Sequence, residues 1–231
     1  MKLPAGPDPN YLAFDTSGPR GSVAVRPASG DVTAVILGER GDHAARLVPA
    51  IDEALRLAGV GVDELAGIVV GEGPGSFTGV RVAAATAKAL SGVLGVSLWP
   101  VSSLAGAAVA TGVPGPSYVL FDARGDRVYG ACYALGEASL ETLNPPHGGE
   151  LRDVLDGDLP RECLFTGDGS LKHRGAIESA GFEVLAASGV CLAEGLLRCI
   201  MLQPEVQTVE DVGAWEPRYV RTSSAERLWT T

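Results

Sequence analysis

Two short segments of this chain resemble each other closely enough to predict an internal duplication. Residues 11–18 read YLAFDTSG and residues 118–125 read YVLFDARG, so Tyr, Phe, Asp and Gly recur at a constant offset of 107 positions. Each copy has the pattern of an apolar strand and a turn, and each leads into a second strand, at residues 22–26 and 127–135. Chance similarity between two apolar strands is the alternative. A true repeat restricts the fold to two copies of one strand–aspartate–turn–strand unit.

Around the first copy, the apolar residues recur in the pattern of an α/β protein. We expect strands at residues 11–15, 22–26, 31–37, 67–71 and 97–101. We expect helices at residues 43–58, capped by Asp42 and ended by Gly59, at residues 78–94, capped by Thr78, and from Ser102 to Gly112. Pro49 fits poorly inside the first helix, so this helix has an irregular first turn or a kink.

The second half of the sequence is less regular. Residues 113–116, Val-Pro-Gly-Pro, are the candidate linker, which predicts one domain over residues 1–112 and a smaller one over residues 113–231. The elements expected after the repeat are a strand fragment and loop at 136–149, strands at 163–166 and 182–185, a helix at 172–180, a helix marked by Val190, Ala193, Leu197 and Ile200, and an extended segment at 216–221. We expect the C-terminal tail to pack back on the first domain.

Residues 71–79, GEGPGSFTG, form a glycine-rich loop between an apolar strand and a helix of small residues. Backbone N–H groups at a helix N-terminus can bind an anion. Gly73, Gly75, Ser76 and Thr78 are therefore candidates for a phosphate or nucleotide site. The loop matches neither the P-loop pattern nor G-x-G-x-x-G, so it lacks the usual signature of phosphate binding.

Asp15 and Asp122 end the two repeated strands. In a duplicated α/β fold, two such carboxylates can flank a cleft between domains and hold Mg²⁺ through water. The alternative is that each aspartate accepts hydrogen bonds from the backbone of its own turn. The matched pair favours a relict nucleotide cleft over a working one.

The sequence contains no recognisable catalytic or metal-binding cluster. Its histidines, His43, His147 and His173, are far apart, whereas a helical metal site takes two ligands three or four residues apart. Ser76 lacks the context of a G-x-S-x-G nucleophile, because Pro74 stands in place of the first glycine. We therefore predict no catalytic residue, no metal and no cofactor of its own.

Composition narrows the functional classes further. The formal net charge of −10 argues against direct binding of nucleic acid, which needs a basic face. The four cysteines lack C-x-x-C spacing, so we expect them to be reduced and mostly buried. The sequence has no signal peptide and no apolar run of about 18 residues. These features predict a cytoplasmic protein that does not span a membrane.

Several motifs resemble those of the TsaB (YeaZ) family. They are Phe14–Ser17, Gly73–Arg81, Phe121–Arg124 with Val128-Tyr129, Asp42-His43 with Leu47–Pro49, and Glu216–Arg221. The likeness covers nearly the whole chain. The block Gly-Pro-Gly-Ser-Phe-Thr-Gly is its most specific part, and TsaD (Kae1) proteins share a looser form of it.

The resemblance implies a fold and a role. The fold is α/β, with two ribonuclease-H-like lobes of the actin, Hsp70 and sugar-kinase (ASKHA) superfamily. The role is that of an accessory subunit in making threonylcarbamoyladenosine beside the tRNA anticodon. The implied partners are TsaD, then TsaE, and a second copy of the chain when TsaD is absent. ATP and metal belong to TsaD in this scheme, and tRNA is met only through the complex.

We expect the partner to bind two helices, at about residues 43–58 and 78–94, whose small side chains allow close packing. The candidate contact residues are His43, Leu47, Ile51, Arg81, Ala84, Ala87 and Lys88. The alternative is that both helices pack only on their own sheet. The alternative function is an independent ATP-binding, kinase-like protein or ATPase of the same fold. A metallopeptidase is a third candidate, but the sequence lacks its metal ligands.

Overall fold

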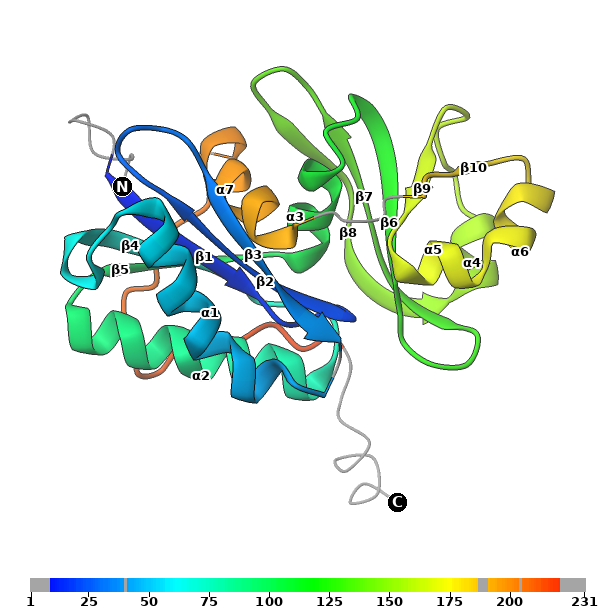
Figure 1. Cartoon of the computed structure of the whole chain (residues 1–231). Coiled ribbons are helices and arrows are strands. Elements are labelled where there is room, and N and C mark those ends of the chain that lie inside the picture. The colour runs from blue at the N-terminus through cyan, green and yellow to red at the C-terminus, as the bar shows by residue number, and fades with distance from the viewer. Residues whose placement is uncertain (1–8, 40, 187–190, 204, 221–231) are drawn as a thin grey trace.

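The computed structural model describes residues 9–39, 41–186, 191–203 and 205–220. It contains two five-stranded sheets with helices on both faces of each sheet (Figure 1). Within the described residues, no helix is both long and apolar enough to span a membrane. All four cysteines are free and buried, as predicted.

The first sheet has the strand order β3-β2-β1-β4-β5. Its strands are β1 (Asn10–Asp15), β2 (Arg20–Arg26), β3 (Thr33–Glu39), β4 (Leu65–Gly71) and β5 (Ser97–Val101). β1, β2 and β3 pair antiparallel, whereas β4 lies parallel to β1 and β5 lies parallel to β4. β1 and β4 are buried on both faces, which explains why their sequences are almost continuously apolar.

The second sheet has the order β10-β9-β6-β7-β8. Its strands are β6 (Gly115–Asp122), β7 (Arg127–Leu135), β8 (Leu140–Glu150), β9 (Leu164–Thr166) and β10 (Glu183–Val184). β6, β7 and β8 pair antiparallel, and β9 and β10 continue the sheet in parallel on the other side of β6.

The second sheet therefore repeats the first, strand for strand. Read from β8 to β10, its order is third, second, first, fourth, fifth, as in the first sheet. Asp15 ends β1 and Asp122 ends β6, at equivalent positions. The predicted duplication and the two ribonuclease-H-like lobes are confirmed. We call the two sheets with their outer helices the first lobe and the second lobe.

The helices form three layers around the sheets (Figure 1). α1 (His43–Ala58) and α2 (Phe77–Leu94) lie on the outer face of the first sheet. α3 (Ser103–Ala110) and α7 (Leu192–Leu202) form the middle layer, between the two sheets. The short helices α4 (Leu151–Leu155), α5 (Asp168–Lys172) and α6 (Arg174–Ser179) cover the outer face of the second sheet. A single turn, η1 (Val62–Glu64), precedes β4.

The core between the sheets joins the lobes. It combines Tyr11 of β1, Tyr133 of β7 and Leu104 of α3 in one buried cluster. α3 and α7 approach so closely that a Cβ on Gly195 would lie 1.9 Å from the carbonyl oxygen of Gly106. α7 also packs on the first sheet although it follows the second one in the sequence, and the N–H of Ala193 donates to the hydroxyl of Ser22 in β2 at 3.0 Å. The domain boundary between residues 112 and 113 stays a prediction.

The first half follows the predicted elements closely. β3 begins two residues later than expected, at Thr33, and α1 runs from His43 to Ala58 with Pro49 inside it. Gly59 ends α1 in the left-handed conformation, as its position predicts. Asp42 precedes the helix, but its side chain makes no capping hydrogen bond; its backbone carbonyl accepts the first helical bonds instead.

The second half differs more from prediction. Gly115 already begins β6, so the predicted linker is shorter than residues 113–116. Residues 140–150 form one continuous edge strand, β8, where a strand fragment and a loop were expected. An edge strand tolerates Pro145 and Pro146 where the register with β7 shifts. The helix expected at residues 172–180 is two short helices that meet at His173. Val190 and Arg221, parts of two predicted elements, lie outside the described residues.

Candidate functional site

The glycine-rich loop expected at residues 71–79 is shorter in the structure, where residues 72–76 connect β4 to α2. α2 begins at Phe77, and the Ser76 hydroxyl oxygen accepts a hydrogen bond from the N–H of Gly79 at 3.4 Å. The prediction that Thr78 caps this helix is wrong. The helix begins before Thr78, so Ser76 is the residue whose hydroxyl reaches the third N–H of the helix.

The N-terminus of α2 packs against the turn that follows β1. The N–H of Ser76 donates to the carbonyl oxygen of Ser17 at 2.8 Å, and the Thr16 hydroxyl donates to the carbonyl oxygen of Gly79 at 2.6 Å. A Cβ on Gly79 would lie 1.9 Å from the Thr16 carbonyl oxygen, and one on Gly75 would lie 2.6 Å from that of Ser17. Close approach to the chain's own backbone therefore accounts for both glycines without a ligand.

Asp15 is fully buried beside this loop. Its Oδ1 accepts hydrogen bonds from the N–H and the hydroxyl of Ser17, both at 2.7 Å, and its Oδ2 accepts from the hydroxyl of Ser103. The Ser103 hydroxyl oxygen in turn accepts from the N–H of Gly73 at 3.1 Å. The carboxylate thus ties the end of β1 to its own turn, to α3 and to the glycine-rich loop, which supports the structural interpretation of Asp15.

Asp122, the equivalent residue of the second lobe, is more accessible. Its Oδ1 accepts hydrogen bonds from Nζ of Lys172 at 2.8 Å and from the N–H of Arg124 at 2.9 Å. Partial burial acts to raise the pKa of Asp122, but these two hydrogen bonds, together with the nearby charges of Lys172 and His173, hold the pKa below its ordinary value. Each aspartate is therefore satisfied by residues of the chain near its own strand.

The three histidines serve different parts of the fold. Nε2 of His43 accepts a hydrogen bond from the N–H of Gly21 at 3.0 Å. His147 contacts the hydroxyl of Tyr118, and Nε2 of His173 is buried with no hydrogen-bond partner among the described residues. The part of the chain that the structure describes holds no group of three or more His, Cys, Asp or Glu residues that could bind a metal ion.

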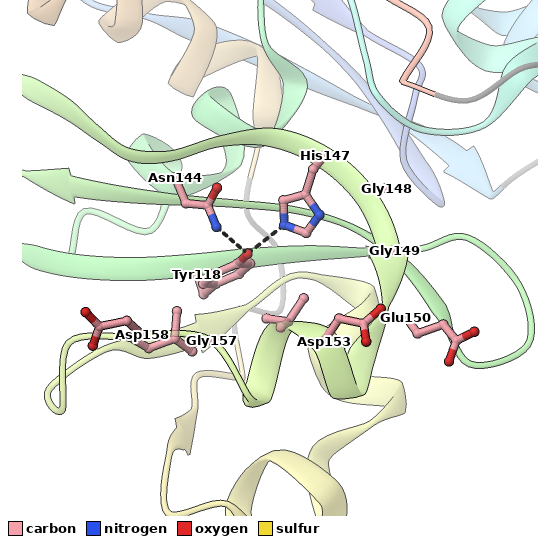
Figure 2. A pocket seen from close by; sticks show the side chains of 11 residues that line it. Tyr118, Asn144, His147, Gly148, Gly149, Glu150, Asp153, Gly157 and Asp158 are labelled. Carbon is pink, nitrogen blue, oxygen red and sulfur yellow. Dashed lines mark hydrogen bonds between the residues drawn. The ribbon is translucent and has the colours of Figure 1, made fainter.

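A cavity of about 310 Å³ lies in the second lobe between β8 and α4 (Figure 2). At its base, the Tyr118 hydroxyl accepts from Nδ2 of Asn144 at 3.1 Å and lies 2.6 Å from Nε2 of His147. Burial raises the pKa of Tyr118 and lowers that of His147, so both side chains are neutral near pH 7. The carboxylates of Glu150 and Asp153 stand at its mouth.

No sequence pattern predicts this cavity. The sequence predicts a strand fragment and a loop at residues 136–149, whereas the register of β8 brings Asn144 and His147 to the same hydroxyl. The only signal was that Tyr118 opens the second copy of the repeat.

Five of the residues predicted to bind a partner are buried within the chain itself. They are His43, Leu47, Ile51, Ala84 and Ala87. The sequence analysis selected the apolar stripe of each helix, and a helix on a sheet must bury that stripe against the sheet. Burial of these five residues within the chain favours the alternative of packing on their own sheet, and their contact with a partner stays a prediction.

Arg81 and Lys88 of α2 contact the C-terminal strap, which we define as residues 205–220. Nζ of Lys88 donates to the carbonyl oxygen of Trp215 at 2.8 Å and lies 3.3 Å from the Glu216 carboxylate. Arg81 is exposed and contacts Tyr219. Figure 1 shows the strap, in orange and red, crossing the first lobe beside α2, so it covers part of the face that the sequence assigned to a partner.

The outer side of α1 and α2 is exposed and rich in small or apolar residues. Val48 is 62% exposed and Val93 is 85% exposed. We define the outward face by its exposed residues Ala45, Val48, Pro49, Ala85, Ala89, Gly92 and Val93. The sequence signal for this face was the run of small residues along α2. These residues occur on both sides of the helix, so the signal does not tell the outward side from the buried one.

Comparisons with known proteins bear directly on this arrangement. A family model described as TsaD, tRNA N6-adenosine threonylcarbamoyltransferase, matches residues 40–188. The tRNA threonylcarbamoyladenosine biosynthesis protein TsaB of Bacillus subtilis is 31% identical over 94% of this chain and 96% of its own length. YeaZ from Pseudomonas aeruginosa superposes with a TM-score of 0.76 at 27% identity, over 91% of this chain and 99% of that one. A second P. aeruginosa structure, described as similar to peptidase YeaZ, has a TM-score of 0.79 at 28% identity, over 92% and 100%.

The repeated strand order and the paired strand-end aspartates define a two-lobed protein of the ASKHA superfamily. Within that class, the match to B. subtilis TsaB extends over nearly the whole of both chains. The chain belongs to the TsaB (YeaZ) family, whose domain is of the TsaD type.

Proposed function

We propose that this chain is a non-catalytic subunit that binds TsaD and, with it, TsaE. In this role it is required for threonylcarbamoyl transfer to the adenosine beside the tRNA anticodon. The observation that carries the proposal is the match to B. subtilis TsaB, a protein described by its part in tRNA threonylcarbamoyladenosine biosynthesis. The net charge of −10 supports contact with tRNA through the complex alone.

The geometry of the glycine-rich loop supports a role without bond-making chemistry. Asp15 is buried and bonded to Ser17 and Ser103, and the N-terminus of α2 is packed against Thr16. A loop that grips a phosphate needs N–H groups open to the ligand. We propose that ATP and metal belong to TsaD and that this chain holds neither.

The outward face of α1 and α2 supports docking. Exposed Ala85, Ala89 and Gly92 let a partner helix approach the backbone of α2 closely. Val93, at 85% exposure, places a large apolar side chain in water, which a partner would cover. We propose that TsaD binds this face and that a second copy of the chain binds it when TsaD is absent.

The alternative is an independent ATP-binding protein, which the duplicated topology favours because it places Asp15 and Asp122 at equivalent strand ends. Ligand binding raises the unfolding temperature by mass action, so a thermal shift assay with ATP and Mg²⁺ separates the two functions. We expect no shift for the lone chain. A clear shift without TsaD supports the alternative.

The direct test is reconstitution of tRNA modification. TsaD, TsaE, a source of threonylcarbamoyl-adenylate and unmodified tRNA are incubated with and without this chain, and threonylcarbamoyladenosine is measured by mass spectrometry. We expect modification only when the chain is present. Equal modification in its absence, or turnover by the chain alone, would contradict the proposal.

A further inference from the structure

Two exposed aromatic rings flank one arginine at the N-terminal end of α2. Phe77 is 43% exposed and Tyr219 is 42% exposed, and their ring centroids lie 5.6 Å apart. The guanidinium carbon of Arg81 lies 3.9 Å from the Phe77 centroid and 5.9 Å from that of Tyr219, and its Nε donates to the Tyr219 hydroxyl at 3.3 Å. We call these three residues the arginine–aromatic cluster.

The cluster is assembled from two distant parts of the chain. Phe77 and Arg81 belong to α2, whereas Tyr219 belongs to the C-terminal strap. The strap is fixed nearby, because Lys88 of α2 binds the carbonyl oxygen of Trp215 at 2.8 Å. The orientation of Arg81 is therefore set by tertiary structure as well as by the helix.

Arg81 keeps hydrogen-bonding capacity after these contacts. Its Nε is used by Tyr219, while its two terminal amino groups have no hydrogen-bond acceptor among the described residues. A planar guanidinium with free N–H groups on one edge matches the two oxygens of a carboxylate. Because two aromatic rings already hold it, Arg81 loses little side-chain entropy when an acceptor binds.

The cluster is continuous with the outward face. Arg81, Ala85 and Ala89 are spaced four residues apart, so they lie on one side of α2. Exposed arginine and aromatic residues of this kind carry much of the binding energy in protein interfaces.

We infer that the arginine–aromatic cluster is the receptor for a carboxylate side chain of TsaD at the edge of the docking face. This inference rests on the proposed function. The C-terminal strap then has a role in partner recognition, since it supplies Tyr219 and so sets the position of the guanidinium.

The test is calorimetric titration of TsaD into the full chain and its variants. We expect Arg81→Ala to weaken binding by about tenfold, and Arg81→Lys to weaken it nearly as much, because an ammonium cannot form the two parallel bonds. Tyr219→Phe keeps the ring and removes the hydroxyl, so we expect a loss of about threefold. The control Arg161→Ala removes an exposed arginine of the second lobe and should bind like the wild type.

The outcomes separate this inference from the proposed function. If Ala89→Arg abolishes binding while both Arg81 variants bind like the wild type, the inference is overturned and the docking face stands. If Arg81→Lys binds TsaD like the wild type while Arg81→Ala binds weakly, a point charge suffices, and the inference that Arg81 receives a carboxylate through two parallel bonds is overturned. If the wild-type chain does not bind TsaD, both proposals fail. Equal unfolding temperatures for all variants show that any loss of binding is local.

Discussion

The two lobes share one topology, but the turns after β1 and β6 are built differently. Asp15 is fully buried and bonded to Ser17 and Ser103, whereas the side chain of Asp122 is 26% exposed and pairs with Lys172. In the first lobe, β4 leads into α2, a helix of 18 residues. In the second lobe, β9 leads into α5, a helix of 5 residues.

The difference shows that a repeat preserves strand order more strictly than it preserves chemistry. In the first lobe, the N-terminus of α2 fills the space beside the β1 turn, and the two long helices present an exposed outer side. In the second lobe, the equivalent turn is held by a partly exposed ion pair, and three short helices cover the sheet. This contrast fits the proposal that the first lobe docks a partner, and at both turns the carboxylate is bonded by groups of the chain itself.

The largest effect on stability should come from adding a side chain where α2 packs against the β1 turn. A Cβ on Gly79 would lie 1.9 Å from the Thr16 carbonyl oxygen, so we expect Gly79→Ala to destabilise the fold by about 3 kcal/mol. In the second lobe, a Cβ added at Gly169 of α5 would lie 2.9 Å from the backbone of Phe121. We therefore expect Gly169→Ala to destabilise the fold by about 1 to 2 kcal/mol.

The matched control for these substitutions is Gly92→Ala, at an open position of α2 with no atom within 4 Å of the added Cβ. It should stabilise the fold by about 0.5 to 1 kcal/mol, because alanine favours a helix. Urea unfolding measures all three variants. Equal changes in the free energy of unfolding for Gly79→Ala and Gly92→Ala would show that the β1 turn moves to accept the added methyl group, which would contradict tight packing there.

The next effect compares the two aspartates. Asp15→Asn replaces one of the accepting oxygens with an amide that cannot accept from Ser17 or Ser103, so we expect a loss of about 2 kcal/mol. Asp122→Asn breaks a partly exposed pair with Lys172 and should cost about 0.5 kcal/mol. Chemical unfolding near pH 7 gives both values. A larger loss for the Asp122 variant would reverse the contrast between the lobes.

The smallest effect is the pH dependence of the Asp122 contribution. The pKa of Asp122 is lower in the folded chain than its ordinary value of 3.8, so the ionised form is favoured by folding. Its stabilisation is present above pH 4 and is lost as the pH falls through the folded pKa. The difference in unfolding free energy between wild type and Asp122→Asn should therefore shrink below pH 4. A difference that grows with acidification would contradict the lowered pKa.

The sequence predicted the parts of the fold that depend on local pattern and repetition. The offset between residues 11–18 and 118–125 predicted equivalent strands, and the glycine at position 59 predicted the end of α1. Only a fragment of β8 was predicted, because Pro145 and Pro146 usually exclude a strand and its edge position alone permits them.

The candidate site was predicted less well because orientation is decided by tertiary packing. Leu47 and Ala87 were assigned to a partner, but the same apolar stripe serves the sheet beneath. Ala89 and Val93 face outward, but their spacing in the sequence does not show whether an exposed face binds a partner or only contacts solvent. The contact between Arg81 and Tyr219 joins residues 138 positions apart, beyond the reach of any local pattern.

The central claim is that this chain acts by docking through the outer helices of its first lobe. The most direct test is the affinity for TsaD of two variants that add the same bulk and charge to exposed alanines, Ala89→Arg on α2 and Ala176→Arg on α6. We predict that Ala89→Arg weakens binding by about a hundredfold or more while Ala176→Arg binds like the wild type. Unchanged affinity for Ala89→Arg, or an equal loss for Ala176→Arg, would contradict the account.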